Sequence, residues 1–375
     1  MPAIAFTLED VKRTVVLTTV QNLHDSPHFL ATAVTIAATT TTEVLQVIVL
    51  SPLFNPPSDA PPSSTPAQSD APSEEDTGAE ARPAAHGAWE APGISRTAYF
   101  EDVQRLLTFV YVQATKVAQD LDRVLLDIDV LLKGTGAAAD AFPDDIVRGA
   151  GRIFSVVPDG TPFPPLPTSV AERNSEIVVV EPDDHPLHAV PPVLAPVDPS
   201  LPPLYPVVAL GGTFDHLHAG HKILLSMGAW IAKEKLIVGV TDDSLLGKKL
   251  RKEVLEPLPV RTERTRAFLE LFKSGIEYFL TPLNDVCGPT GWDPNVQAVV
   301  VSKETLSGAE SIAKKREEMA FQPLRAFVID VISATEASVD SEDAAVLRTA
   351  KMSSTYIREW IVKKQQGIAT SEQRS

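Results

Sequence analysis

The sequence predicts an α/β protein whose C-terminal domain is built on a doubly wound, parallel five-stranded sheet and whose N-terminal part forms a separate α/β domain. Two observations carry this prediction. Beyond residue 205, five short apolar runs alternate with helical patterns, which is typical of a parallel sheet with right-handed crossovers. Before them, eight prolines fall within residues 186–206 and separate this regular part from an earlier set of strands and helices.

The prolines place the domain boundary. The N-terminal α/β domain is expected at 1–185, a Pro-rich linker at 186–205 and the C-terminal domain at 206–375. Proline-rich chain is extended and semi-rigid. We therefore expect few core contacts to cross the boundary, and we expect a fragment comprising residues 201–375 to fold without the rest.

The N-terminal domain combines strands and helices with a disordered insertion. β-branched apolar runs predict the strands, and apolar residues three or four apart predict the helices. Residues 55–93 contain no Ile, Leu, Val, Phe or Met, so they cannot bury enough apolar surface to offset the entropy of ordering and are expected to be disordered. The strands are expected at 14–17, 44–50, 123–132 and 176–181, and the helices at 27–39 and 98–121.

In the C-terminal domain the same signals recur in a regular order. Apolar runs predict five strands, helical periodicity predicts the helices between them, and a last helix is expected to start near Ser353. The strands are expected at 206–210, 236–241, 276–280, 297–302 and 326–332, and the intervening helices at 219–234, 260–273 and 304–320.

Charge and composition exclude several classes of protein. The net charge is −16, and residues 1–205 hold 11 Lys and Arg against 27 Asp and Glu, whereas residues 206–375 hold 22 of each. Such a chain is a poor candidate for nonspecific binding of nucleic acid or of an anionic membrane. Its single cysteine, Cys287, excludes an intramolecular disulfide framework and a zinc site of several thiolates. The sequence has neither an apolar run of membrane length nor a secretory signal, so a cytoplasmic protein is expected.

The most informative stretch is GGTFDHLHAGH, which occupies 211–221 directly after an apolar strand. A helix expected from about Ala219 would present free N–H groups and the positive end of its dipole to a phosphate. Three glycines, Gly211, Gly212 and Gly220, leave room for the ligand. The imidazoles of His218 and His221 are three residues apart at the helix start, so both can donate hydrogen bonds to one phosphate.

Other readings of this stretch are weaker. It is not the G-x-G-x-x-G fingerprint of dinucleotide-binding proteins, and the chain contains no Walker A loop. A zinc site could use His216, His218 and His221, but the spacing suggests no fourth ligand. A purely structural strand–turn–helix stays open.

A second motif, KMSSTYIR at 351–358, opens the last helix. Ser353 or Ser354 is a natural N-cap, and capping alone would explain a lone serine pair. Because the H-x-G-H element lies about 130 residues upstream, the two motifs together are more specific than either one.

The two motifs resemble those of the nucleotidyltransferase superfamily, whose members share a Rossmann-like sheet. Within it, the sequence is similar to the eukaryotic, fungal-type phosphopantetheine adenylyltransferases. The similarity covers about 205–366 and rests on GGTFDHLHAGHK, VGVTD, VVVSKET and SSTYIR, which begin at 211, 238, 299 and 353. Residues 163–170 also resemble the N-terminal region of the animal bifunctional CoA synthase. No kinase domain with a Walker A loop follows, so a monofunctional enzyme is expected.

The resemblance implies a reaction in which ATP and 4′-phosphopantetheine give dephospho-CoA and pyrophosphate, with Mg²⁺ accompanying ATP. The substrate phosphate would attack the α-phosphorus directly, without a covalent enzyme intermediate. Chemistry agrees with this, because a phosphate is already an anionic nucleophile. The protein need only bring two polyanions together and stabilise the added charge.

The resemblance also implies site residues. His221, His218 and Lys248 are the catalytic candidates, and no protein ligand to a metal is expected. The candidates for binding phosphopantetheine are Thr213, Phe214, Lys249 and Lys303, and those for binding ATP are Gly211, Gly212, His218, Gly220, His221, Lys351, Ser353, Ser354, Thr355 and Arg358.

Several of these assignments leave alternatives. Lys248 and Lys249 are not distinguished, because the loop that holds them is longer than in bacterial relatives. Lys303, with one of the three consecutive basic residues 314–316, is a candidate to replace the arginines that bacterial relatives carry after the fourth strand. Phe214 and Asp215 either shape the pocket or have a structural role, and Arg264 is expected on a solvated face.

Two other functions stay open. A cytidylyltransferase of the same fold would use CTP, although KMSST at 351–355 differs from the C-terminal motif usual in those enzymes. A non-catalytic subunit of a CoA-synthesis assembly is the third hypothesis, and the intact His218, His221 and Ser354 argue against it for the C-terminal domain. The N-terminal domain is a candidate surface for other enzymes of CoA biosynthesis.

Overall fold

A computed structural model of the chain describes residues 8–57, 89–137, 139–140, 142–158, 161, 163–184, 200–329 and 353–372. It contains two parallel five-stranded sheets, one in each half of the chain. Among the described residues, no helix combines the length and the apolar character needed to span a membrane.

The N-terminal sheet has the strand order β3-β2-β1-β4-β5, with β1 at its centre. Its strands are β1 (Val11–Thr19), β2 (Thr41–Leu50), β3 (Asp127–Lys133), β4 (Arg152–Val156) and β5 (Ile177–Val179), and its helices are α1 (Ala31–Thr39), α2 (Phe100–Asp120), α3 (Asp144–Arg148) and α4 (Thr168–Ala171). In the centre of the sheet, Val16 lies opposite Val47 of β2 and Phe154 of β4.

Most of the predicted N-terminal elements are confirmed, with two differences. The strand expected at 123–132 begins only at Asp127, because the chain turns at Asp122, whose φ is 58°, and Arg123 N donates a hydrogen bond to Ala118 O at 2.7 Å. The sequence pattern misses β4 altogether. Its five residues are too few to show a period, although the strand lies next to the centre of the sheet.

The C-terminal sheet has the order β10-β9-β6-β7-β8 and confirms the predicted doubly wound α/β domain. Its strands are β6 (Tyr205–Gly212), β7 (Ala232–Thr241), β8 (Glu277–Leu283), β9 (Ala298–Ser302) and β10 (Arg325–Ile329), and its helices are α5 (Ala219–Ile231), α6 (Leu258–Phe272), α7 (Leu306–Glu318) and α9 (Ser354–Glu372). Helix α5 stops three residues earlier than predicted, because β7 starts at the very next residue, Ala232.

The two sheets have the same topology. Counted within its own half of the chain, each sheet has its strands in the order third, second, first, fourth, fifth, and all pairs are parallel. In each half a helix connects the first strand to the second (α1, α5) and another helix connects the second to the third (α2, α6). The N-terminal half therefore repeats the architecture of the C-terminal half.

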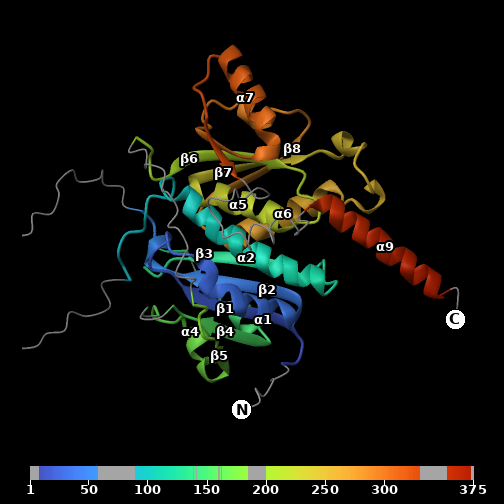
Figure 1. The fold of residues 1–375 in the computed structure, drawn as a ribbon. Helices are drawn as coiled ribbons and strands as arrows, with labels where there is room; N and C mark the ends of the chain where they lie inside the picture. The colour runs from blue at the N-terminus through green and yellow to red at the C-terminus, as the bar shows by residue number, and fades with distance from the viewer. Residues whose placement is uncertain are drawn as a thin grey trace, which may run out of the picture.

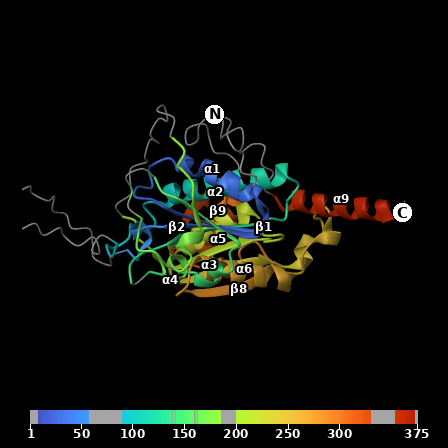
Figure 2. The ribbon, with the colours of Figure 1, turned by 90° about the horizontal axis from the view of Figure 1, so that it is seen from below.

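The two halves pack closely. Helices α2, α5 and α6 lie between the sheets, as Figure 1 shows, and buried apolar side chains of both halves form one continuous core. Phe100 of α2 packs against Phe327 of β10 with ring centroids 4.9 Å apart. The expectation that few core contacts cross the domain boundary is therefore wrong. Seen from below in Figure 2, helix α9 extends away from this body.

The ends of the predicted insertion 55–93 are ordered. Asn55 is 3% exposed, and its side-chain amide donates hydrogen bonds to Trp89 O and Ala91 O at 3.0 and 2.8 Å. Its Oδ1 accepts from the backbone N–H groups of Thr135 and Gly136, each at 2.8 Å. The expected boundaries are thus too wide at both ends, and the central residues 58–88 lie outside the described residues.

Candidate active site

The carboxyl edge of the C-terminal sheet brings the two motifs together. Strands β6 to β9 are parallel, so the segments that follow them lie at one edge. The loop after β6 carries the first motif, and α9 carries the second. Their contact is direct, because the Ser354 hydroxyl at the start of α9 donates to Asp215 O at 2.8 Å across 139 residues of sequence.

The loop after β6 has an unusual backbone. Phe214 and His216 have φ of 51° and 45°, in the left-handed region that non-glycine residues seldom adopt. Arg261 of α6 stabilises this conformation: its buried guanidinium donates to Thr213 O at 2.5 Å and to Glu256 O and Thr241 O at 2.9 Å each. Strained backbone conformations that neighbouring groups hold in place are common at ligand sites.

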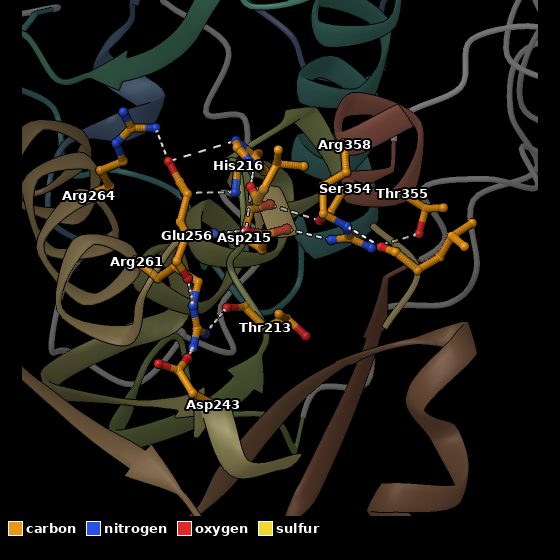
Figure 3. Close-up of polar contacts among 12 residues, drawn as sticks. Thr213, Asp215, His216, Asp243, Glu256, Arg261, Arg264, Ser354, Thr355 and Arg358 are labelled. Atoms are coloured by element: carbon orange, nitrogen blue, oxygen red, sulfur yellow. Dashed lines mark hydrogen bonds and ion pairs between the residues drawn. The ribbon is translucent and has the colours of Figure 1, made fainter. Parts of the chain in front are cut away.

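Asp215 joins the loop to α9. The carboxylate is fully buried and accepts hydrogen bonds from Glu256 N at 2.9 Å and from Arg358 Nη1 at 2.5 Å (Figure 3). Arg358 also donates to Leu250 O at 2.8 Å and to the Thr355 hydroxyl at 3.1 Å. A buried ion pair thus fixes the first turn of α9 beside the loop.

His216 makes its hydrogen bonds with the segment that precedes α6. Its Nε2 donates to Val254 O at 2.8 Å, and its backbone N–H donates to Glu256 Oε2 at 2.8 Å. Within the described residues, no group of three or more His, Cys, Asp or Glu side chains is placed to hold a metal ion. The alternative of a zinc site on His216, His218 and His221 does not fit this geometry.

His218 and His221 lie together at the start of α5. His218 is the N-cap residue, and its Nδ1 accepts a hydrogen bond from Gly220 N at 3.2 Å. A neutral imidazole that accepts at Nδ1 carries its proton on Nε2, so His218 Nε2–H is a donor. The two rings stack with centroids 3.9 Å apart, and the His221 Nδ1 is buried without a hydrogen-bond partner in the described part of the chain.

Both imidazoles are neutral at pH 7. Burial, with smaller contributions from His216 and Arg358, lowers the pKa of His218 to about 3. Burial, with smaller contributions from His218 and Lys249, lowers the pKa of His221 well below its ordinary value. Each ring therefore has one N–H with which to bind a phosphate and does not depend on protonation to do so.

The lysine candidates lie on exposed segments at the same edge. Lys248 and Lys249 follow the short 3-10 helix Asp243–Leu246 after β7, and Lys303 starts the 3-10 helix Lys303–Thr305 after β9. Of the first two, Lys249 is the one whose charge lowers the pKa of His221, which favours it as the closer to the site. Lys351 lies outside the described residues.

Phe214 does not face a ligand. Its ring is fully buried and lies 5.3 Å from the His221 ring, centroid to centroid. A Cβ on Gly212 would lie only 3.0 Å from this ring, so the glycine makes room for Phe214. We correct the expected substrate contact of Phe214 to a place in the wall behind the histidines.

Two of the predicted arginines also have structural roles. Arg358, expected to bind ATP, is 1% exposed, and its guanidinium donates hydrogen bonds to the Asp215 carboxylate and to Leu250 O. Arg316, considered as a replacement for bacterial arginines, is 1% exposed and donates to Gln322 O after α7 and to three carbonyl oxygens of the segment 290–296 before β9. Lys314 and Lys315 are exposed, and Lys315 pairs with Glu318.

Glu256 and Arg261 are the site residues that the motifs do not reveal. Arg264, expected on a solvated face, is exposed and pairs with the otherwise buried Glu256 at 2.5 Å. A signal for Arg261 does exist, because it falls on the helical stripe that it shares with Phe268 and Phe272. An arginine on a buried stripe indicates a guanidinium with several internal partners.

Comparison with known proteins agrees with this site. The cytidylyltransferase-like family model matches residues 209–360, from β6 into α9. The phosphopantetheine adenylyltransferase of Pyrococcus furiosus is 37% identical over 128 residues, which are 34% of this chain and 79% of that protein. The chain belongs to the phosphopantetheine adenylyltransferase family.

Two yeast relatives are similar over a longer stretch. The phosphopantetheine adenylyltransferase of Saccharomyces cerevisiae is 46% identical over 152 residues, covering 40% of this chain and 47% of that protein. An uncharacterized protein of Schizosaccharomyces pombe is 39% identical over 158 residues, covering 42% and 48%. The matched part spans about half the length of these two relatives.

Proposed function

We propose that the chain transfers AMP from ATP to 4′-phosphopantetheine, giving dephospho-CoA and pyrophosphate. The observation that carries this proposal is the meeting of the two motifs at one sheet edge, where neutral His218 and His221 lie at the start of α5 and Ser354 contacts the same loop. The family membership supports it, since relatives with this name share the C-terminal half.

In the proposed reaction, a phosphate oxygen of phosphopantetheine forms a bond to the α-phosphorus of ATP. The bond from that phosphorus to the oxygen that bridges to the β-phosphate breaks, and pyrophosphate leaves with the electron pair. The side chains supply no nucleophile. Their task is to align two polyanions and to stabilise the charge that builds up on the transferred phosphoryl group.

We assign the residues accordingly. His221 donates to the α-phosphate, and His218 donates to ATP phosphates through Nε2–H. The N–H groups at the start of α5 present the positive end of the helix dipole to these phosphates. Thr213, Lys249 and Lys303 are placed on the side of the phosphopantetheine phosphate.

The first turn of α9 binds the outer phosphates of ATP in this proposal. Ser353 is its N-cap residue, since the Ser353 hydroxyl accepts from Tyr356 N at 3.2 Å. Together with Ser354 and Thr355 it forms a hydroxyl-lined helix start, which is a suitable site for phosphate oxygens.

We propose that Mg²⁺ binds to the phosphates of ATP rather than to a set of protein carboxylates. Asp215, the acidic residue of the first motif, is buried and both of its oxygens accept hydrogen bonds from other groups. When bound, the ion neutralises part of the phosphate charge. We place the activity in the cytoplasm, a reducing compartment that suits the free thiol of Cys287.

The direct test is to incubate the purified full chain with ATP, Mg²⁺ and phosphopantetheine and to measure dephospho-CoA and pyrophosphate. A parallel incubation replaces ATP with CTP, and another replaces phosphopantetheine with phosphoethanolamine. Product formation only with ATP and phosphopantetheine supports the proposal. Turnover of CTP would support a cytidylyltransferase, and no turnover in any incubation would support a non-catalytic protein.

A further inference from the structure

Helix α5, which carries both histidines, lies between its own sheet and the N-terminal half of the chain. Eleven of its 13 residues are buried, so it has no solvent-exposed face. A Cβ on Gly228 would lie 2.4 Å from Leu210 of β6, which shows how closely the helix approaches the sheet on one side. The opposite side faces α2 and β3 of the N-terminal half.

The first turns of α5 are tied to the N-terminal half by Lys222, the residue next to His221. The Lys222 ammonium is buried and makes ion pairs with Asp127 and Asp129 of β3, the second at 2.6 Å. It also donates to Ile128 O at 2.8 Å. All three N–H groups of the ammonium therefore have partners on β3.

The two carboxylates of this cluster stabilise the charged form of Lys222. Burial would lower the pKa of Lys222, but Asp129 and Asp127 outweigh that effect and raise it above its ordinary value. The second oxygen of Asp129 accepts from Gln46 Nε2 of β2 at 3.2 Å, so the carboxylate is itself held in place. Lys222 is thus a charged side chain with a partner, Asp129, that is itself held in place by a hydrogen bond.

Apolar side chains do not completely fill the interface beside Lys222. A cavity of about 600 Å³ lies between the halves at this end of α5. Its lining includes His216 and His218 of the site loop together with Lys222, Asp127 and Phe268. Beside this cavity, the ion pairs of Lys222 tie the first turn of α5 directly to β3 of the N-terminal half.

The last turn of α5 is held separately. Trp230 Nε1 donates to Arg96 O at 2.9 Å, and the Arg96 guanidinium lies 4.5 Å from the centroid of the Trp230 ring. Arg96 Nη1 also donates to Trp230 O at 3.3 Å. The N-terminal half therefore contacts α5 near both of its ends.

The N-terminal half does not itself present an open phosphate site at the corresponding place. Its helix α1 corresponds to α5 in the repeated topology, and the first turn of α1 is occupied by Asp183. Asp183 accepts hydrogen bonds from Thr32 N at 2.7 Å and from the Thr32 hydroxyl at 2.5 Å. An internal carboxylate thus takes the position that a bound anion would take in α5.

We propose that Lys222 is a positioning residue of the transfer reaction and that the N-terminal half, through Asp127 and Asp129, holds the histidine-bearing end of α5 in its reactive placement. The N-terminal half is then a repeat of the adenylyltransferase architecture that supports the site without binding nucleotide. The activity readout of this inference rests on the function proposed above.

The experiment compares full-length Lys222→Met with Lys133→Met as a matched control. Lys133 is also a buried lysine of the interface, and its ammonium donates hydrogen bonds to Leu271 O and Phe272 O of α6. Lys222→Met should lower kcat about 10- to 100-fold, because small misplacements of catalytic groups have effects of this size. The KM for ATP should change less than about threefold, since ground-state binding is less sensitive to geometry.

Two further variants keep the test independent of folding. Asp127→Asn changes a carboxylate that is 57% exposed, so the protein should fold, and kcat should fall in the same direction by about 3- to 10-fold. Lys222→Arg preserves the charge beside Asp127 and Asp129 and should lose less kcat than Lys222→Met. The control Lys133→Met should keep kcat within about twofold of wild type even if its melting temperature falls as much as that of Lys222→Met.

The inference is overturned if Lys222→Met keeps wild-type kcat, or if Lys133→Met loses kcat equally at a similar loss of stability. Absence of product with the wild-type protein would instead reject the proposed function. In that case the placement of the site is read from the ¹⁵N shifts of His218 and His221. These should move in Lys222→Met and stay unchanged in Lys133→Met, and the reverse would reject the positioning role.

Discussion

The ion pair between Asp215 and Arg358 should control whether α9 stays docked at the site. Replacing Asp215 with Asn removes the charge that Arg358 Nη1 contacts at 2.5 Å. The Asn Oδ1 can still accept from Glu256 N, as the carboxylate does at 2.9 Å. The variant therefore tests the ion pair while it preserves the other hydrogen bond of this side chain.

The magnitude follows from burial. Asp215 and Arg358 are 0% and 1% exposed, so the variant leaves a guanidinium without its counter-charge inside the protein. Removal of one partner of a buried pair typically costs about 3–5 kcal/mol. Undocking of α9 returns Arg358 to water, so this loss should appear as detachment of α9 rather than as global unfolding. The first turn of α9, with Ser353 and Ser354, would then leave the site.

Hydrogen exchange of the backbone amides around Ile357 and Val362, which are buried in α9, measures this detachment. A loss of about 3 kcal/mol corresponds to exchange about 100-fold faster, and the KM for ATP should rise in parallel. The double variant Asp215→Asn/Arg358→Met has no unpaired charge and should exchange more slowly than Asp215→Asn alone. Unchanged exchange in Asp215→Asn would refute the role assigned to the pair.

Three further outcomes are expected. His221→Ala should lower kcat by about 10²–10³ and weaken ATP binding much less, as measured by steady-state kinetics and calorimetry, because its N–H acts mainly in the transition state. Because the pKa of His218 is about 3 in the folded protein and near 6.5 in the unfolded chain, the unfolded chain binds more protons between these values. The contribution of His218 to the free energy of unfolding is therefore complete above pH 6.5 and is lost as the pH falls toward 3. Between these pH values, the urea midpoint of unfolding should decrease less in His218→Gln than in the wild-type protein. The fragment 201–375 should be insoluble or inactive on expression, contrary to the expectation from the linker alone. In this fragment Lys222 lacks both carboxylate partners and Trp230 is exposed. A folded, active fragment would contradict this prediction.

Local patterns in the sequence are sufficient to predict the C-terminal sheet and the place of the site. Alternating apolar runs and helical patterns predict β6 to β10, because the strands of a parallel sheet with helices on both faces are largely apolar. The start of α5 at Ala219 and the capping role of Ser353 are equally local, since a helix start depends on the few residues around it. Element boundaries set by turns, such as that before β3, escaped this reasoning.

Local patterns do not reveal which charged side chains are used inside the protein, because this depends on contacts between distant segments. Arg358 and Arg316 have the composition of phosphate binders, but each is buried among carbonyl oxygens or carboxylates from segments far away in the sequence. The same holds for Lys222, whose partners Asp127 and Asp129 lie about 90 residues upstream across a proline-rich linker. A guanidinium or ammonium group becomes structural when distant elements supply its partners, and no local period in the sequence records that juxtaposition.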